Sequence, residues 1–166
     1  MATTGKIRSN AIGVYLSSDR GLTTIDDTAA DDTYELVACA TSGSFSGSME
    51  VLDATTKDND GQREILTGGL TWSMSAEGMV QYNLGATLTS SLDLFDIWTG
   101  KTKVRLAWTT GTSGDYMYYG NAYITSYEES AGLNEIASYS VTFEGDGSIT
   151  KATVNTTSAT FTNNDD

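Results

Sequence analysis

Carboxylates are the main side chains in this chain that could carry chemistry, because other catalytic groups are scarce. The chain has no histidine, only one cysteine (Cys39) and no GxxxxGK[ST] loop. Histidine-dependent nucleophilic catalysis, His- or thiolate-ligated zinc and P-loop phosphate binding are therefore excluded. Glu128 and Glu129 could be considered as the acid–base pair of a glycosidase. Adjacent residues of a strand point to opposite faces, so we expect no enzyme active site there.

Calcium is the second chemistry that the carboxylates permit. One candidate loop is the run Asp58, Asn59, Asp60 and Gly61, but Glu64 follows too early to close an EF-hand. The other acidic stretch contains Asp26, Asp27, Asp31 and Asp32. We interpret both as solvated loops and expect no metal ion and no other cofactor.

Charge and composition restrict the functional class further. Nine Lys and Arg against 22 Asp and Glu give a formal net charge of −13, which disfavours nucleic-acid binding through a basic patch. Pro is absent and Gly reaches 17, so Gly, Asn, Asp and Ser must form the turns of a mainly β chain. The length fits one domain. The chain begins without a signal-peptide pattern and contains no membrane-spanning run, so we expect synthesis in a cytoplasm and no membrane partner.

Three segments, 44–51, 71–77 and 136–144, alternate polar and apolar residues with the period of a strand. We expect the apolar residues to face a core, with Phe45, Met49 and Val51 on the first segment. The opposite faces carry small hydroxyl groups and glutamate, and no Lys or Arg occurs from 64 to 100 or from 106 to 150. These candidate surface residues are Ser44, Ser46, Ser48, Glu50, Thr71, Ser73, Ser75, Glu77, Ser138, Ser140, Thr142 and Glu144.

One helix is predicted between an N-cap at Ser90 or Thr89 and a stop at Gly100. Its apolar stripe, expected to pack on the sheet, is Leu88, Leu92, Leu94, Phe95 and Trp98. Further strands are predicted over 11–18, 34–40, 103–108 and 116–127. A single domain over 1–155 would then carry a flexible arm (1–10), a long polar loop (52–69) and a flexible tail (156–166).

Two stretches resemble the major tail proteins, or tail tube proteins, of long-tailed, siphovirus-type phages. The first comprises residues 55–58 (TTKD) and 68–78 (GGLTWSMSAEG). The second and more specific one comprises 122–127 (AYITSY) and 134–147 (NEIASYSVTFEGDG). With the helix between them they cover about residues 45–150.

The resemblance implies a β-sandwich or barrel-like tail tube fold with one flanking helix and a long inter-ring loop. It also implies a non-enzymatic virion protein, assembled in the host bacterial cytoplasm into hexameric rings that stack as a tail tube for DNA ejection. The hydroxyl and glutamate faces would line the lumen, through which genomic DNA passes without specific binding. Its partners would be further copies of itself and the tape measure, tail terminator and distal tail proteins. The candidate inter-ring residues are Thr55, Thr56, Lys57, Asp58, Asp60, Arg63 and Glu64.

Two other functional classes stay open from the sequence. Tube proteins of type VI secretion, contractile or gene-transfer-agent particles share the fold in outline. A carbohydrate-binding β-sandwich would need exposed aromatic rings, for which Tyr116, Tyr118 and Tyr119 are the candidates. We expect the three tryptophans on core faces, which disfavours this class; they are Trp72, Trp98 and Trp108.

Overall fold

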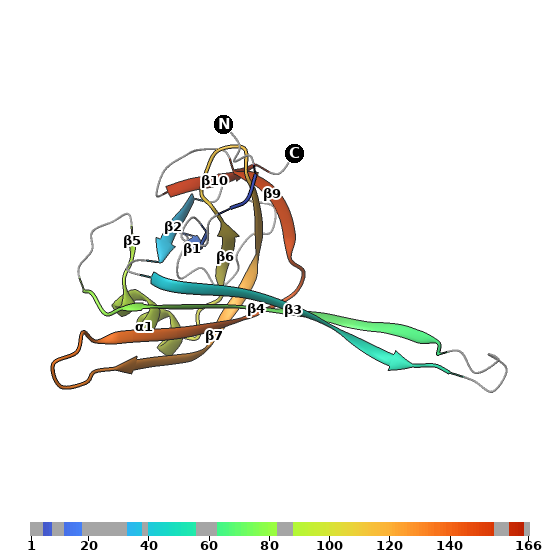
Figure 1. Ribbon diagram of the computed structural model, residues 1–166, viewed down its shortest axis with the longest axis horizontal. Coiled ribbons are helices and arrows are strands. Elements are labelled where there is room, and N and C mark those ends of the chain that lie inside the picture. Colours follow the sequence, from blue (N-terminus) through green and yellow to red (C-terminus); the bar gives the residue numbers. More distant parts are fainter. Residues whose placement is uncertain are drawn as a thin grey trace.

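A computed structural model of the chain describes residues 5–7, 12–17, 33–37, 40–55, 63–82, 88–154 and 160–164. Within them lie ten strands and one helix (Figure 1). In chain order they are β1 (Gly13–Ser17), β2 (Thr33–Val37), β3 (Ala40–Asp53), β4 (Ile65–Met79), β5 (Leu88–Thr89), α1 (Ser91–Thr99), β6 (Val104–Thr109), β7 (Tyr116–Ser130), β8 (Ser138–Gly145), β9 (Thr150–Val154) and β10 (Thr160–Asn164). The predicted mainly β fold with one flanking helix is confirmed.

The strands form a small barrel with a sheet extending from it. The hydrogen-bonded order is β3-β4-β8-β7-β6-β1-β2-β10-β9, and an additional β7–β9 pairing closes the barrel β7-β6-β1-β2-β10-β9. β7 belongs to both parts, because residues 116–122 pair with β6 and β9 while residues 122–130 pair with β8. The extension therefore consists of β3, β4, β8 and the distal part of β7.

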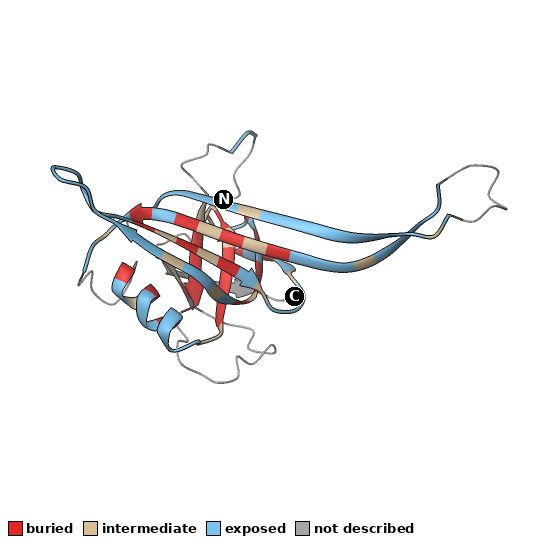
Figure 2. Cartoon of the chain, turned by 90° about the horizontal axis from the view of Figure 1, so that it is seen from below, coloured by how far each residue is buried: buried red, intermediate tan, exposed pale blue. Residues whose placement is uncertain are grey.

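Two hydrophobic clusters stabilise these two parts. One fills the barrel and includes Tyr34, Met117 and Val154. The larger cluster lies between the extension sheet, the barrel and α1, and includes Met74, Val141 and Leu106. Trp72, Met74 and Ala76, and likewise Tyr139, Val141 and Phe143, are buried as their alternation predicts (Figure 2).

Helix α1 begins after Ser90, one of the two predicted N-cap residues. The Ser90 hydroxyl accepts a hydrogen bond from the Asp93 amide (3.3 Å), and the Asp93 carboxylate accepts one from the Ser90 amide (2.8 Å), which is a capping box. The predicted apolar stripe is partly wrong, because Leu94 and Ile97 are buried whereas Leu92, Phe95 and Trp98 are exposed. A nine-residue helix at the margin of the sheet buries only one narrow line of side chains.

The distal part of the β3–β4 hairpin, beyond the bulge at Glu50, projects as an arm from the rest of the molecule (Figure 1). The predicted boundaries of the loop 52–69 are wrong: Leu52 pairs with Leu66 and Asp53 with Ile65, so both strands continue into it. Met49 and Val51, expected to face the core, are exposed because this part of β3 has left the body. Branched apolar residues in the arm favour an extended, paired backbone.

Two further expectations are corrected. Residues 160–164 of the predicted flexible tail form β10, which pairs with β2 and β9; Thr and Phe in this segment favour strands. Of the tryptophans, Trp72 is buried, Trp108 is half-buried and Trp98 is exposed on α1. The N-terminal residues 1–4 and 8–10, Cys39 and the tail residues 156–159 and 165–166 lie outside the described residues.

Candidate functional site

The predicted hydroxyl and glutamate residues of β3, β4 and β8 come together on one face of the extension sheet, here called the polar face. Strand pairing aligns them in rows that cross the sheet. The rows are Met79, Ser138 and Ser130; Ser42, Glu77, Ser140 and Glu128; Ser44, Ser75, Thr142 and Ser126; Ser46, Ser73, Glu144 and Tyr123; and Ser48 and Thr71. Because side chains alternate along each strand, the apolar residues between them face the core instead.

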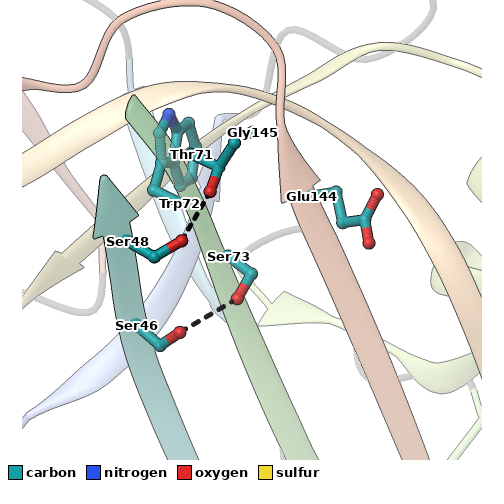
Figure 3. A pocket seen from close by; sticks show the side chains of 7 residues that line it. All are labelled: Ser46, Ser48, Thr71, Trp72, Ser73, Glu144 and Gly145. Atoms are coloured by element: carbon teal, nitrogen blue, oxygen red, sulfur yellow. Dashed lines mark hydrogen bonds between the residues drawn. The ribbon is translucent and has the colours of Figure 1, made fainter. Parts of the chain in front are cut away.

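Cross-strand hydrogen bonds hold the short side chains of this face together. The hydroxyl oxygens of Ser48 and Thr71 lie 2.7 Å apart, and those of Ser46 and Ser73 lie 3.4 Å apart (Figure 3). The Ser44 and Ser75 hydroxyls also bond, at 2.8 Å. These small side chains bond to each other across the strands and do not protrude far from the sheet.

The charge of the polar face has one sign. Glu77, Glu144 and Glu128 provide carboxylates, and strands β3, β4, β7 and β8 contain no Lys or Arg. Neighbouring cations are engaged elsewhere. Lys103 forms an ion pair with Asp146 at 2.5 Å, and Arg105 is buried with its Nε donating to Asn121 at 3.1 Å. The surface is therefore anionic and offers no cation to a phosphate.

Strand β7 adds residues that sequence reasoning missed, namely Ser126, Glu128 and Ser130. A register shift between Ile124 and Ser126 interrupts the alternation, so a simple period of two does not identify them. Ser42 was missed as well; its hydroxyl donates to the Glu77 carboxylate at 3.2 Å. The signal for Ser42 was present, since it continues the series of serines on β3.

Glu50, a predicted residue, and Glu129, which was rejected above as half of a catalytic pair, do not lie on the polar face proper. Glu50 lies at the bulge where the arm begins, next to Gly68, at the margin of the polar face. Glu129 accepts a hydrogen bond from the Tyr127 hydroxyl on the opposite face from Glu128. Burial of the Tyr127 hydroxyl is the main cause that raises the pKa of this residue, and the hydrogen bond to the Glu129 carboxylate raises it further. The two adjacent glutamates thus point to opposite faces of the sheet, as expected for neighbours on a strand.

Polar contacts join the two strands at the end of the arm. The Asp53 carboxylate accepts hydrogen bonds from the Thr55 amide (3.0 Å) and hydroxyl (2.5 Å) and lies 3.6 Å from Arg63 Nε. The bonds from Thr55 lower the pKa of Asp53. Glu64 donates its amide to the Thr55 hydroxyl at 3.2 Å. Of the other candidate inter-ring residues, Thr56, Lys57, Asp58 and Asp60 lie outside the described residues.

Two open edges flank the polar face. Within the described residues, β3 pairs only with β4, and residues 123–130 of β7 pair only with β8. Open edges of this length normally invite pairing with another chain. Neither edge is blocked by Pro or Lys, which are the usual protections.

The sequence matches a family model described as phage tail tube protein over residues 16–151. The chain belongs to the phage tail tube protein family. This confirms the resemblance based on the β4 and β7–β8 stretches and identifies a structural component of the virion tail. No curated protein sequence matches the chain significantly.

Solved structures share the fold of this tail tube protein at low sequence identity. A chain of the virion of a native gene transfer agent particle superposes with a TM-score of 0.68 at 17% identity, covering 88% of this chain and 98% of that one. The SPP1 tail tube gives 0.65 at 15% identity, with 92% and 82% covered. The anti-feeding prophage baseplate gives 0.55 at 10% identity, with 91% and 97% covered.

Other kinds of site find little support in the described part of the tail tube protein. Those residues contain no group of three or more His, Cys, Asp or Glu placed to hold a metal ion. The acidic runs 58–60 and 26–32 lie outside them. None of their helices is long and apolar enough to cross a membrane. Of the three tyrosines considered for a sugar platform, Tyr119 is buried, whereas Tyr118 and Tyr116 are exposed, with Phe45 stacked on the first and Lys151 over the ring of the second.

Proposed function

We propose that this tail tube protein forms hexameric rings that stack into a tube, with the polar face lining the lumen. The observation that carries the proposal is an anionic face, free of Lys and Arg, that ends on each side at a strand edge without a partner among the described residues. Only an assembly in which neighbouring copies pair these edges makes the face continuous. A barrel built in this way leaves no open edge.

Strand directions favour such a closure. Each neighbouring pair in the series β3, β4, β8 and β7 is antiparallel. β7 of one copy and β3 of the next therefore run antiparallel when all copies point the same way along the tube. Two structures with the same fold are described with six-fold symmetry, namely the tail of an empty gene transfer agent particle and the anti-feeding prophage baseplate.

A lumen lined by hydroxyl groups and carboxylates suits the passage of double-stranded DNA. Proteins retain DNA chiefly through Lys and Arg, which neutralise phosphates and release counterions. A wall that consists mainly of Ser, Thr and Glu and carries no Lys or Arg makes no such contact, so DNA can slide. The protein is then a structural conduit and not an enzyme.

The arm is suited to joining successive rings. Its residues Leu52, Ile65 and Leu66 are exposed, and consecutive apolar residues of a strand lie on opposite faces. Contact with the adjacent ring would cover this apolar surface. The tape measure, tail terminator and distal tail proteins are the expected further partners inside and at the ends of the tube.

Electron microscopy of the purified protein tests the proposal. We expect six-membered rings or tubes whose density places the polar face towards the axis. A protein that stays monomeric at every concentration would contradict the assembly. Tubes with Ser46 and Glu144 on the outside would contradict the lumen assignment alone.

The alternative function is that of a tube protein in a contractile particle, a secretion particle or a gene transfer agent. It is favoured by the fold shared with the anti-feeding prophage baseplate and the gene transfer agent virion. The material found inside particles purified from the producing cell, DNA or protein, distinguishes these readings.

A further inference from the structure

An aromatic surface on α1 is only partly covered within a single chain. Leu92, Phe95 and Trp98, here called the α1 patch, are 46%, 42% and 40% exposed. The Trp98 ring stacks on Tyr127 with centroids 6.2 Å apart, and Phe95 packs edge-on against Tyr127 at 5.8 Å. Side chains held in fixed positions with one uncovered side are typical of a contact surface.

A cavity of about 500 Å³ continues this surface to the open edge of β7. Trp98, Thr99 and Lys101 line it from the end of α1, and Tyr123 and Ile124 line it from β7. Residues 123–130 of β7 form the edge that has no partner strand among the described residues. Any strand added to this edge would therefore run past the cavity and the α1 patch.

β3 also carries exposed apolar side chains. Phe45, on its core-directed side, stacks on Tyr118 of the same chain. Further along the same side, Met49 and Val51 are 47% and 44% exposed. The opposite side of β3 carries Ser44, Ser46 and Ser48.

We propose that the α1 patch and its cavity are the docking surface for Met49 and Val51 of a second copy of this chain. The inference rests on the proposed ring, because β3 must pair with the β7 edge of its neighbour. A strand added there continues the polar face with its serines and directs its apolar residues to the other side of the sheet, where α1 lies.

The chemistry and charge of the cavity fit Met49 and Val51 of a neighbouring β3 strand. The flexible thioether of Met49 can fill an irregular cavity and contact the Trp98 ring favourably. Lys101 stands at the cavity, and β3 contains no basic residue that would repel it. Each chain would then cover apolar surface on both of its neighbours, as a head-to-tail ring requires.

Disulfide trapping tests the contact. In a Cys39→Ser background, one tagged chain carries Met49→Cys and a second, untagged chain carries Trp98→Cys. We expect oxidation after co-assembly to produce the mixed dimer. The matched control replaces Trp98→Cys by Leu133→Cys, a residue that is 94% exposed in the turn between β7 and β8. The inference is overturned if tubes form and Leu133→Cys cross-links at least as efficiently as Trp98→Cys.

A second measurement covers the case in which the cysteine variants fail to assemble. Trp98→Ala should raise the protein concentration needed for assembly by about tenfold or more, as expected for loss of a central aromatic anchor. Leu133→Ala should leave it unchanged. Equal effects of the two variants would overturn the inference. If the unmodified protein forms no rings at all, the proposed function itself is wrong. That question is answered by the unmodified protein and not by the comparison of these variants.

Discussion

The indole of Trp72 on β4 lies directly against the backbone of Gly145 at the end of β8. A β-carbon on Gly145 would come within 2.1 Å of the ring atom Cε2. The indole Nε1 also donates a hydrogen bond to the carbonyl of Gly147 at 3.1 Å, which holds the ring under the turn that follows β8. This tryptophan therefore fastens the extension sheet to the turn, and Gly145 supplies the space that it occupies.

Gly145→Ala should destabilise the protein. The added methyl group collides with a rigid buried ring, and such overpacking costs about 1–3 kcal/mol. Thermal unfolding of the unassembled chain measures the loss. Gly69→Ala on β4 is the control, because nothing lies within 4 Å of the added β-carbon. Similar unfolding temperatures for both variants would show that Trp72 moves aside easily.

Ser90→Ala should destabilise α1 by about 1 kcal/mol, since it removes the N-cap hydroxyl from the capping box with Asp93. Unfolding in urea measures the change. Ser130→Ala is a suitable control because Ser130 is exposed at the end of β7. The prediction fails if the two variants unfold at the same urea concentration.

Labelling of cysteines should distinguish the lumen from the outer surface. In a Cys39→Ser background we expect Ser46→Cys in assembled tubes to react with a small maleimide, but not with a maleimide attached to a protein too large to enter. Thr153→Cys, exposed on β9, should react with both reagents. Rapid reaction of Ser46→Cys with the large reagent in intact tubes would show that the polar face points outwards.

The carboxyl of Asp53 should titrate below its ordinary pKa of 3.8, because hydrogen bonds from Thr55 favour its ionised form. Because the pKa of Asp53 is lower in the folded arm than in the unfolded chain, these hydrogen bonds stabilise the folded arm at any pH above 3.8. The stabilisation is lost as the pH falls through the pKa that Asp53 has in the folded arm. NMR of the side-chain carboxyl carbon measures the midpoint. Thr55→Ala should return the midpoint towards 3.8, and an unchanged midpoint would exclude Thr55 as the cause.

Replacing the apolar residues of the arm should separate ring formation from stacking. With Leu52→Ser and Leu66→Ser we expect rings to form but tubes to be shorter or absent in electron micrographs, because the contact between rings loses its apolar surface. Tyr116→Ser, at an exposed position on the barrel, should leave tube length unchanged. Full-length tubes from the double variant would argue against an inter-ring role of the arm.

The sequence by itself determined the features that depend on neighbouring residues. Alternation along β3, β4 and β8 predicted which side chains share a face, because successive residues of a strand point in opposite directions. Ser90 or Thr89 was predicted as the N-cap where α1 begins, because capping depends on residues close together in the sequence. The family was likewise indicated by short sequence motifs, such as residues 134–147.

The tertiary structure decided the features that depend on contacts between residues distant in the sequence. Only the sheet order brings Ser44, Ser75 and Thr142 into one row, since hydrogen bonds between strands distant in sequence set the register. The bulge in β7 moved Ser126 and Glu128 onto the polar face against a simple period of two. Burial of Leu94 but not Phe95 likewise depends on how α1 sits against the sheet, because a side chain is buried only where a partner surface covers it.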